Sequence, residues 1–231
     1  MTYKGKSKVI QPGDTTDTLR MTFTDNVTAF NGEKSAAPSG KGAVCAAISH
    51  LIYRYLAVHG IETHLVSEID STTALVKKAK IVPIEIIVRN LAAGGFSKKY
   101  GVAEGTQLAH PTVEFSVKSD ELGDPMINKS QITAIGLATE SELDAMIAQS
   151  EKINLLLTEL FAKARIKLAD FKLEFGNSDG KIILCDEISP DSCRLWDMDT
   201  EQKLDKDVFR RDLGDVIEVY SEVLRRLENV I

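Results

Sequence analysis

The stretch that decides the fold is Asp170-Phe-Lys-Leu-Glu-Phe-Gly176, followed by Cys185-Asp-Glu-Ile-Ser-Pro-Asp-Ser-Cys-Arg-Leu-Trp-Asp197. Its first part alternates strictly between charged and apolar residues, the pattern of a β-strand that buries one face. Asn177-Ser-Asp-Gly180 is a turn signal, and the apolar run after it predicts a returning strand. The resulting hairpin brings Glu174 near Asp186, to within one residue of register.

Two carboxylates at this spacing, with Lys172 beside them, suit a Mg²⁺ ion that carries the phosphates of a nucleotide. Arg194 follows as a candidate anion clamp. The alternative is an ordinary amphipathic hairpin with a solvated polar face. The run from Asp186 to Asp197 favours a functional site, because it carries five acidic or basic groups and yet holds the only Trp of the chain.

The composition of the 231 residues is that of an ordinary globular protein, with 43% hydrophobic residues and a net charge of -6. This charge argues against bulk nucleic-acid binding but is compatible with a local basic pocket for a phosphorylated small molecule. Cys45, Cys185 and Cys193 form no CxxC or Cys/His cluster, so neither a disulfide framework nor a zinc site is supported. With no signal-peptide core and no membrane-spanning run, we expect a soluble, cytoplasmic protein without a membrane partner.

The predicted fold class is α+β, with two lobes. Residues 1–85 form a β-rich N-terminal lobe, residues 86–231 form a C-terminal lobe of helices on a sheet, and a cleft between them holds the ligand. Apolar residues at helical spacing predict one helix in the first lobe, over Val44–Ala57. An opening hairpin and a further antiparallel meander are predicted from the strands Lys6–Ile10, Leu19–Asp25, Thr63–Ile69, Thr73–Lys80 and Ile81–Arg89.

Two long helices are predicted in the second lobe. Thr139 with Glu142 forms a capping-box pattern, and the helix that begins there should run to about Ala164. Its buried stripe is predicted to be Leu155, Leu156, Leu160 and Phe161. The last helix is predicted from near Asp207 to Leu227, with an inward face of Val208, Leu213, Val216, Ile217, Tyr220 and Leu224.

Two segments of the first lobe carry candidate binding residues, each with a plain alternative. Lys6 and Lys8 share one face of a strand, where they can neutralise phosphate charge, or they belong to a solvated basic terminus. Thr28 and Asn31 can bind a small ligand, or they belong to an ordinary Asn-Gly turn.

Two segments of the second lobe also carry candidate binding residues, each with a plain alternative. Arg89 ends an apolar strand, where a buried guanidinium needs an anion, and the alternative is a structural Arg–carboxylate pair. The Ala-Gly-Gly turn after it lets backbone N–H groups approach a phosphate. Lys118 and Asp124 lie in a charged loop that can bind a zwitterion or be simply exposed. The four histidines show no metal-ligand spacing.

Taken in chain order, these segments closely resemble the SAICAR synthetase family over almost the whole chain. The most specific matches are Tyr3-Lys-Gly-Lys-Ser-Lys8, Val82-Pro-Ile-Glu-Ile-Ile-Val-Arg-Asn-Leu-Ala-Ala-Gly94, Gly123-Asp-Pro-Met-Ile127, Asp170–Gly176 and Asp186–Asp197. The resemblance implies a kinase-like or ATP-grasp-like fold, Mg²⁺ dependence and a homodimer or higher homo-oligomer. It implies a ligase of purine biosynthesis that joins L-aspartate to the carboxylate of carboxyaminoimidazole ribonucleotide (CAIR), consuming ATP and releasing ADP and phosphate.

The resemblance also implies roles for individual residues. Lys6 and Lys8 would contact the ATP phosphates, and Glu174 and Asp186 would hold Mg²⁺. The adenine would be enclosed by Leu19, Ile81, Val82, Ile84 and Glu85. The ribonucleotide would be surrounded by Arg89, Ser97, Lys172, Arg194 and Arg210, and the candidates for the aspartate side are Lys118, Asp124, Thr28 and Asn31. The catalytic candidates are Lys172, Asp191 and Arg194.

One position departs from the family pattern. Many relatives have a serine where this chain has Gly95, so a serine hydroxyl on the ribonucleotide phosphate is absent here. A backbone N–H group or Ser97 would take its place.

Two other functions would use the same groups. A small-molecule kinase needs the lysines and carboxylates but no amine site, and aspartate-dependent release of ADP separates it from a ligase. A nucleotide-binding regulatory module would bind ATP without turning it over.

Overall fold

The alternating stretch of sequence forms β11 (Ile166–Ser178), the central strand of the larger of two main sheets. β8 (Lys80–Leu91) pairs antiparallel with one edge of β11, and β12 (Lys181–Cys185) and β13 (Cys193–Asp197) pair with the other. Beyond β8 lie β9 (Gln107–Val117) and β10 (Met126–Ile127). The computed structural model describes residues 2–231, and the side chain of Asn31, which has a predicted role, lies outside the side chains described.

The two faces of β11 differ as its sequence predicts. Phe171, Leu173 and Phe175 are buried in the hydrophobic core. On the other face Lys172 is partly exposed, but Asp170 and Glu174 are almost fully buried. The charged face is therefore covered by other parts of the chain, and the alternative of a solvated polar face is wrong.

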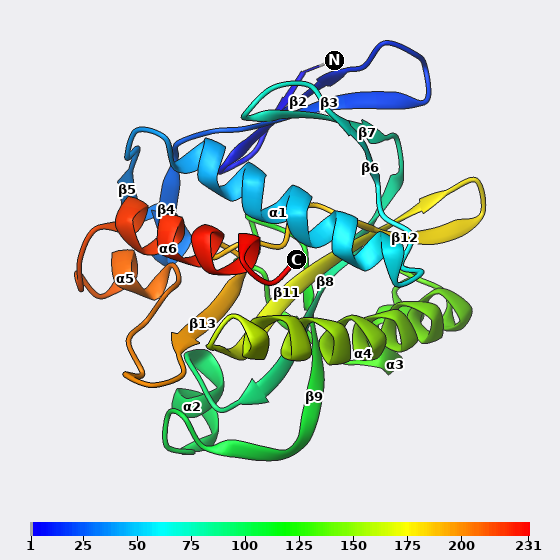
Figure 1. Cartoon of the computed structure of the whole chain (residues 1–231). Helices are drawn as coiled ribbons and strands as arrows, with labels where there is room; N and C mark the ends of the chain where they lie inside the picture. The colour runs from blue at the N-terminus through cyan, green and yellow to red at the C-terminus, as the bar shows by residue number, and fades with distance from the viewer. Residues whose placement is uncertain (1) are drawn as a thin grey trace.

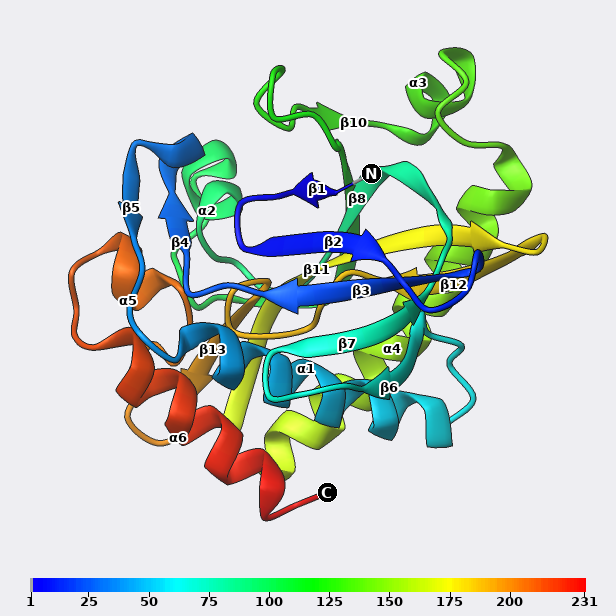
Figure 2. The same ribbon diagram turned by 90° about the horizontal axis from the view of Figure 1, so that it is seen from above.

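The smaller sheet is formed by the N-terminal segments in the order β1-β2-β3-β7-β6, seen from above in Figure 2. Its strands are β1 (Tyr3–Lys4), β2 (Lys8–Pro12), β3 (Thr18–Phe23), β6 (Leu65–Glu68) and β7 (Thr73–Lys77). A separate hairpin is formed by β4 (Val27–Ala29) and β5 (Lys34–Ala36), joined by the short 3₁₀ helix η1 (Phe30–Gly32). β2 and β3 confirm the predicted opening hairpin.

Three long helices pack around the sheets (Figure 1). α1 (Lys41–Val58) lies against β3 and against α6 (Val216–Glu228), and α4 (Glu140–Lys163) covers β11 and β8. The short helices are α2 (Gly95–Tyr100), α3 (Lys129–Ala134) and α5 (Asp207–Arg210). None of the helices in the described part of the chain is long and apolar enough to cross a membrane.

α1 is shared by two hydrophobic clusters. Ile48 and Ile52 face the larger cluster with β8, β11 and α4, while Cys45 and Ala46 face a second cluster with Met21 on β3 and Tyr220 on α6. Helix α1 therefore joins the small sheet to the rest of the molecule.

The prediction that Ile81–Arg89 continues the N-terminal meander is wrong. This segment lies in β8, which pairs with β9 and β11 of the larger sheet and not with β7. The pairing buries Val82, Ile84, Ile86 and Val88 in the core, and this burial favours the larger sheet. The predicted boundary between residues 85 and 86 falls within β8, and the division into two lobes stays a prediction.

In α4 the structure confirms the predicted capping box but only part of the predicted buried face. Thr139 Oγ1 accepts the N–H of Glu142 at 3.2 Å, and the Glu142 carboxylate accepts the N–H of Thr139 at 2.9 Å, so the capping box is confirmed. Leu155 is wrongly predicted as buried, because it is 73% exposed. The buried face of α4 contains Ile153, Leu157 and Leu160. Leu155 lies two positions from both Ile153 and Leu157, so its side chain points away from this face.

The predicted last helix is broken in two. α5 ends at Arg210 and α6 begins at Val216, where the Asp215 carboxylate accepts the N–H of Ile217 at 2.6 Å. Leu213 lies in the break and is 57% exposed, so its predicted inward position is wrong. The N-cap at Asp215 begins a new helix, so the single continuous helix that hydrophobic spacing predicts is not formed.

Two leucines of α4 test this assignment of its faces. We expect Leu157→Ala to lower the free energy of unfolding by roughly 2–5 kcal/mol, because it leaves a cavity in the core. The control Leu155→Ala should change it by less than about 0.5 kcal/mol. Urea unfolding followed by circular dichroism measures both, and equal losses would contradict the assignment.

Candidate active site

A cavity of about 420 Å³ lies between the small sheet and the charged face of the larger sheet. Its walls come from β2, β3 and β7 on one side and from β8, β11 and the residues after β12 on the other. Its apolar lining includes Leu19, Met21, Val76 and Ile81. Such a surface suits a flat heterocycle.

Two of the residues predicted to enclose an adenine do not contribute side chains to the cavity. Val82 and Ile84 point to the opposite face of β8 and pack in the hydrophobic core. Ile81 and Glu85 line the cavity as predicted. Only backbone groups of Val82 and Ile84 are left to contribute to such a site, because side chains alternate along a strand.

Cations and carboxylates alternate along the wall of the cavity. Lys8 Nζ lies 2.5 Å from Asp186 Oδ1 and 2.6 Å from Glu187 Oε1. Burial alone would lower the pKa of Lys8, but these two carboxylates outweigh it and hold the pKa above its ordinary value. Lys6, by contrast, is half-exposed and pairs with Asp120 at 2.6 Å.

Glu174 and Asp186 converge on Lys172. Lys172 Nζ lies 2.7 Å from Glu174 Oε1 and 3.9 Å from Asp186 Oδ2, and 2.7 Å from Glu85 Oε1. The strand register explains this, since Glu174 pairs with Cys185 and Asp186 comes next. Asp186 has a φ of +63°, a left-handed conformation that is uncommon outside glycine but tolerated by Asp.

The charged loop before β10 also contributes Lys118, Asp120 and Asp124 to the wall of the cavity. Lys118 Nζ is 2.8 Å from Glu174 Oε1, which places this lysine beside the candidate metal ligands. Asp124 lines the cavity, but its carboxylate also accepts the N–H of Ser119 at 2.9 Å and so shapes its own loop. Thr28 lines the cavity as well.

Arg89 and Arg194 share one buried carboxylate, and neither lines the cavity. Both guanidinium groups pair with Asp170, Arg194 at 3.0 Å, and Arg89 Nε also donates to Glu114 at 2.8 Å. The structure thus contains the Arg–carboxylate pair that the sequence left as an alternative for Arg89. Arg194 also contacts Asp207, which binds Arg210 at 2.6 Å.

The turn before α2 is built around Arg194. Gly94 has a φ of +54°, and a Cβ atom there would collide with the Arg194 guanidinium. Gly95 is exposed, and a Cβ atom there would meet nothing within 4 Å. The Ser97 hydroxyl is buried and has no hydrogen-bond partner among the described residues. At Gly94 both the positive φ and the position of Arg194 therefore favour glycine, and at Gly95 neither does.

Two residues of the site escaped the sequence analysis. Lys206 lines the cavity and makes no ion pair with any described residue, and burial lowers its pKa. Lys41 is 1% exposed and pairs with Asp191. The available signals were weak: Lys206 precedes a predicted helix in a polar run, and Lys41 lies between two glycines before an apolar helix.

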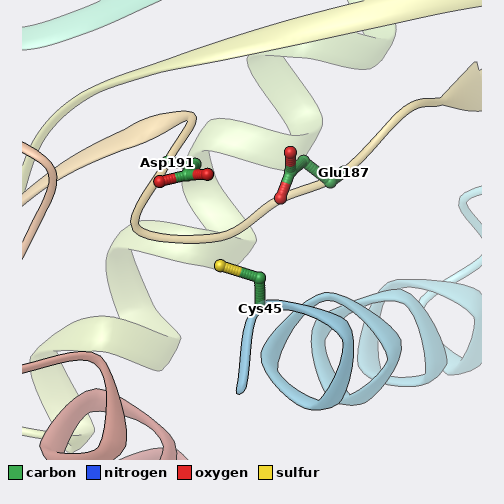
Figure 3. Close-up of side chains that lie close together, drawn as sticks. All are labelled: Cys45, Glu187 and Asp191. Carbon is green, nitrogen blue, oxygen red and sulfur yellow. The ribbon is translucent and has the colours of Figure 1, made fainter. Parts of the chain in front are cut away.

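Cys45, Glu187 and Asp191 lie close together (Figure 3), with ligand atoms within 4.8 Å of one another, and the last two line the cavity. Burial and the Asp191 carboxylate raise the pKa of the Cys45 thiol, so it stays protonated. The Lys41 ammonium pairs with Asp191, and Lys8 pairs with Glu187. A cysteine binds a metal ion as the thiolate, so the protonated Cys45 thiol argues against a metal centre at this group.

The comparisons with known proteins agree with one another. The family described as SAICAR synthetase matches residues 1–227. A phosphoribosylaminoimidazole-succinocarboxamide synthase from Finegoldia magna is 50% identical over 226 residues, covering 97% of each chain. The crystal structure of the enzyme of that name from Ehrlichia chaffeensis is 45% identical, with a TM-score of 0.96 over 99% of this chain and 98% of its own.

A second solved structure, described as a SAICAR synthetase in complex with ADP, is 43% identical, with a TM-score of 0.95 over 98% of this chain and 97% of its own. The matches in sequence and structure each extend over nearly the whole chain. The chain therefore belongs to the SAICAR synthetase family, the ATP-dependent ligases of purine biosynthesis.

Proposed function

We propose that this enzyme joins L-aspartate to the carboxylate of CAIR, with conversion of ATP to ADP and phosphate. The observation that carries the proposal is the alternation of Lys8, Asp186, Lys172 and Glu174 in a cavity that also has an apolar lining. It offers cations for a triphosphate and oxygen ligands for a divalent cation within one cavity.

For ATP, we propose that the adenine lies against Leu19 and Ile81, with the backbone of the Val82–Glu85 segment at its edge. Lys6 and Lys8 then neutralise the phosphates. Lys8 pairs with two carboxylates and is mostly buried, whereas Lys6 is half-exposed and pairs with Asp120 of the charged loop.

Glu174 and Asp186 fit a Mg²⁺ ion by their chemistry. Both offer carboxylate oxygens, the donors that this cation prefers. The two lysine hydrogen bonds to Glu174 both fall on Oε1 and the one to Asp186 falls on Oδ1, so the second oxygen of each carboxylate keeps its lone pairs. When bound, the ion would neutralise charge that develops on the phosphates. Lys172 and Lys118 neutralise the same carboxylates from the protein side.

For the ribonucleotide, we propose the arginine cluster with the turn at Gly95 and Ser97. Arg194 is 20% exposed in its side chain, and a guanidinium has five N–H donors, so pairing with Asp170 leaves donors for a phosphate. Arg210 lies close to Arg194, because both pair with Asp207. The unpartnered Ser97 hydroxyl is compatible with a ligand contact.

For L-aspartate, the candidates are Lys118, Asp124, Thr28 and Asn31, to which we add Lys206. Lys206 and Lys77 are the lysines of this cavity without an ion pair to any described residue, and Lys206 is the less exposed of the two. A cation in that condition suits a carboxylate of a substrate.

The chemistry requires an activated carboxylate, because a carboxylate oxygen is a poor leaving group. In the proposed mechanism a CAIR carboxylate oxygen attacks the γ-phosphorus, the bond to the ADP oxygen breaks, and an acyl phosphate forms. The aspartate amine then attacks the carbonyl carbon, the C–N bond forms, phosphate leaves with the former carboxylate oxygen, and the proton that the amine loses passes to the departing phosphate. Lys172 lies where it can neutralise the transferred phosphoryl group, and positioning supplies much of the acceleration.

Asp191 suits a hydrogen-bond acceptor for the amine better than a general base. Burial raises the pKa of Asp191, but Lys206 and Lys41 outweigh it and hold the pKa below its ordinary value. A carboxylate of low pKa is a weak base but a permanent acceptor. Homo-oligomer formation and a cytoplasmic location stay predictions.

The proposed metal site can be tested with Glu174→Gln. We expect turnover to fall by about 100-fold or more and the Mg²⁺ concentration for half-maximal activity to rise, because an anionic ligand is lost. Glu62→Gln is a matched control, since Glu62 pairs with Lys181 on the surface. Near-normal turnover in a folded Glu174→Gln enzyme would remove Glu174 from the metal site.

The turn at Gly94 and Gly95 gives a paired test of the ribonucleotide site. Gly95→Ser has room for its side chain and restores the hydroxyl common in relatives, so KM for CAIR should stay equal or fall by up to about tenfold. Gly94→Ser should raise KM for CAIR, because its Cβ atom displaces Arg194, with KM for ATP little changed. If both variants alter KM for ATP and CAIR equally, this turn does not serve the ribonucleotide.

The reaction itself is tested with ATP, Mg²⁺ and CAIR, with and without L-aspartate. We expect rapid ADP release only when aspartate is present, which excludes a simple kinase and a non-catalytic module. With oxygen-18 in the CAIR carboxylate, the label should appear in the released phosphate. Product formation without label transfer would overturn the acyl phosphate step but not the substrate assignment.

A further inference from the structure

Asp191 lines the cavity, yet it is held from behind by two helices whose side chains do not line it. The Tyr220 hydroxyl on α6 donates to Asp191 Oδ1 at 2.7 Å, and the Lys41 ammonium on α1 pairs with Oδ2. We propose that Lys41 and Tyr220 are positioning residues that fix the Asp191 carboxylate for the attacking amine. This inference rests on the proposed function for the role of the amine.

Lys41 is anchored on its own side of the contact. Its ammonium also donates to the carbonyl oxygen of Asn26 at 3.0 Å. The first turn of α1 is fixed by Asp25, whose carboxylate accepts the N–H groups of Gly40 at 3.1 Å and of Gly42 at 2.9 Å. Lys41 therefore reaches Asp191 from a rigid base.

Tyr220 is equally constrained. Its side chain is fully buried in the cluster with Met21, Phe23 and Cys45, and its hydroxyl has Asp191 as partner. A buried hydroxyl is costly without a hydrogen bond, so the position of the ring and the position of the carboxylate are coupled.

The Asp191 carboxylate has a feature that packing alone does not explain. Asp191 Oδ2 is buried and makes no hydrogen bond with acceptable geometry, although it is ion-paired with Lys41. Lys206, from the segment before α5, lies on the cavity side. An ionised acceptor that is fixed in direction and belongs to a residue lining the cavity can orient the N–H of an amine for attack.

The groups that face Asp191 come from every element packed on it. Lys41 and Cys45 come from α1, Tyr220 from α6, Glu187 from the same loop, and Lys206 from the segment before α5. Of these, Tyr220 can lose its contact with the smallest change in packing, through substitution by Phe.

Tyr220→Phe is therefore the central experiment. We expect kcat/KM for aspartate to fall roughly 5- to 30-fold through the loss of a hydrogen bond to a charged group, with KM for ATP within about twofold of the wild type. The acidic limb of the kcat/KM profile should move to higher pH, because the lost donor stabilised the ionised carboxylate. A purely structural role would not produce this shift.

Ser150→Ala is the matched control for a lost buried hydroxyl. The Ser150 hydroxyl is fully buried and donates to the carbonyl oxygen of Met146 at 2.7 Å within α4. Its substitution should lower thermal stability but leave the aspartate kinetics and the pH profile unchanged. If Tyr220→Phe behaves like this control, the inference is overturned.

A double variant decides whether Tyr220 acts through Asp191. In an Asp191→Asn background, Tyr220→Phe should change kcat/KM by less than about twofold, because the ionised carboxylate that Tyr220 orients is gone. A full 5- to 30-fold loss in that background would contradict the inference. Lys41→Arg should retain more activity than Lys41→Met, since the guanidinium preserves the ion pair.

A titration independent of catalysis separates this inference from the proposed function. In protein labelled with carbon-13 at the aspartate carboxyls, the Asp191 resonance is assigned by its loss in Asp191→Asn. Tyr220→Phe should raise the Asp191 pKa by about half a unit or more. An unchanged pKa would overturn the positioning role, whereas a wild-type enzyme that makes no product from ATP, CAIR and aspartate would overturn the proposed function alone.

Discussion

The antiparallel pairing of β8 with β11 is the constraint on which the rest of the structure depends. It sets Glu85 opposite Glu174 and Arg89 opposite Asp170 on the face toward the cavity. On the other face it sets the apolar residues of both strands against α4. A slip of one residue would move every charge of β11 into the core, so the register of the core and the geometry of the site are fixed together.

The charges of the cavity compensate one another in the absence of ligand. Lys8 lies between Asp186 and Glu187, and Lys172 lies between Glu85 and Glu174. A buried ion without a partner costs several kcal/mol, so this alternation makes a densely charged cavity compatible with folding. In the proposed function, phosphates would replace carboxylates as partners of the lysines, and a divalent cation would replace lysines as the partner of the carboxylates.

The loop after β12 connects this charge array to the helices behind it. Asp186 and Glu187 face Lys8, and Asp191 faces Lys41 and Tyr220. The loop is therefore held by the small sheet through Lys8, by α1 through Lys41 and by α6 through Tyr220. Residues from three distant segments converge on a few consecutive positions, which explains why a polar loop can be so deeply buried.

The sequence by itself determined the features that arise within a few residues. The two faces of β11, the hairpin that brings Glu174 to Asp186, and the capping box at Thr139 follow from alternation, turn chemistry and local hydrogen bonds, and all three are observed. The order of the motifs along the chain also determined the family.

Only the tertiary structure decided what depends on residues far apart in the chain. The assignment of β8 to the larger sheet, the partners of Arg89, the exposed position of Leu155 and the burial of Lys41 each depend on which distant element covers the residue. Lys206 shows most clearly what local sequence cannot predict. A lysine in a polar run becomes a candidate substrate-binding residue only when the fold places it in a cavity. Burial and charge pairing are properties of the assembled chain, and local sequence patterns carry no record of them.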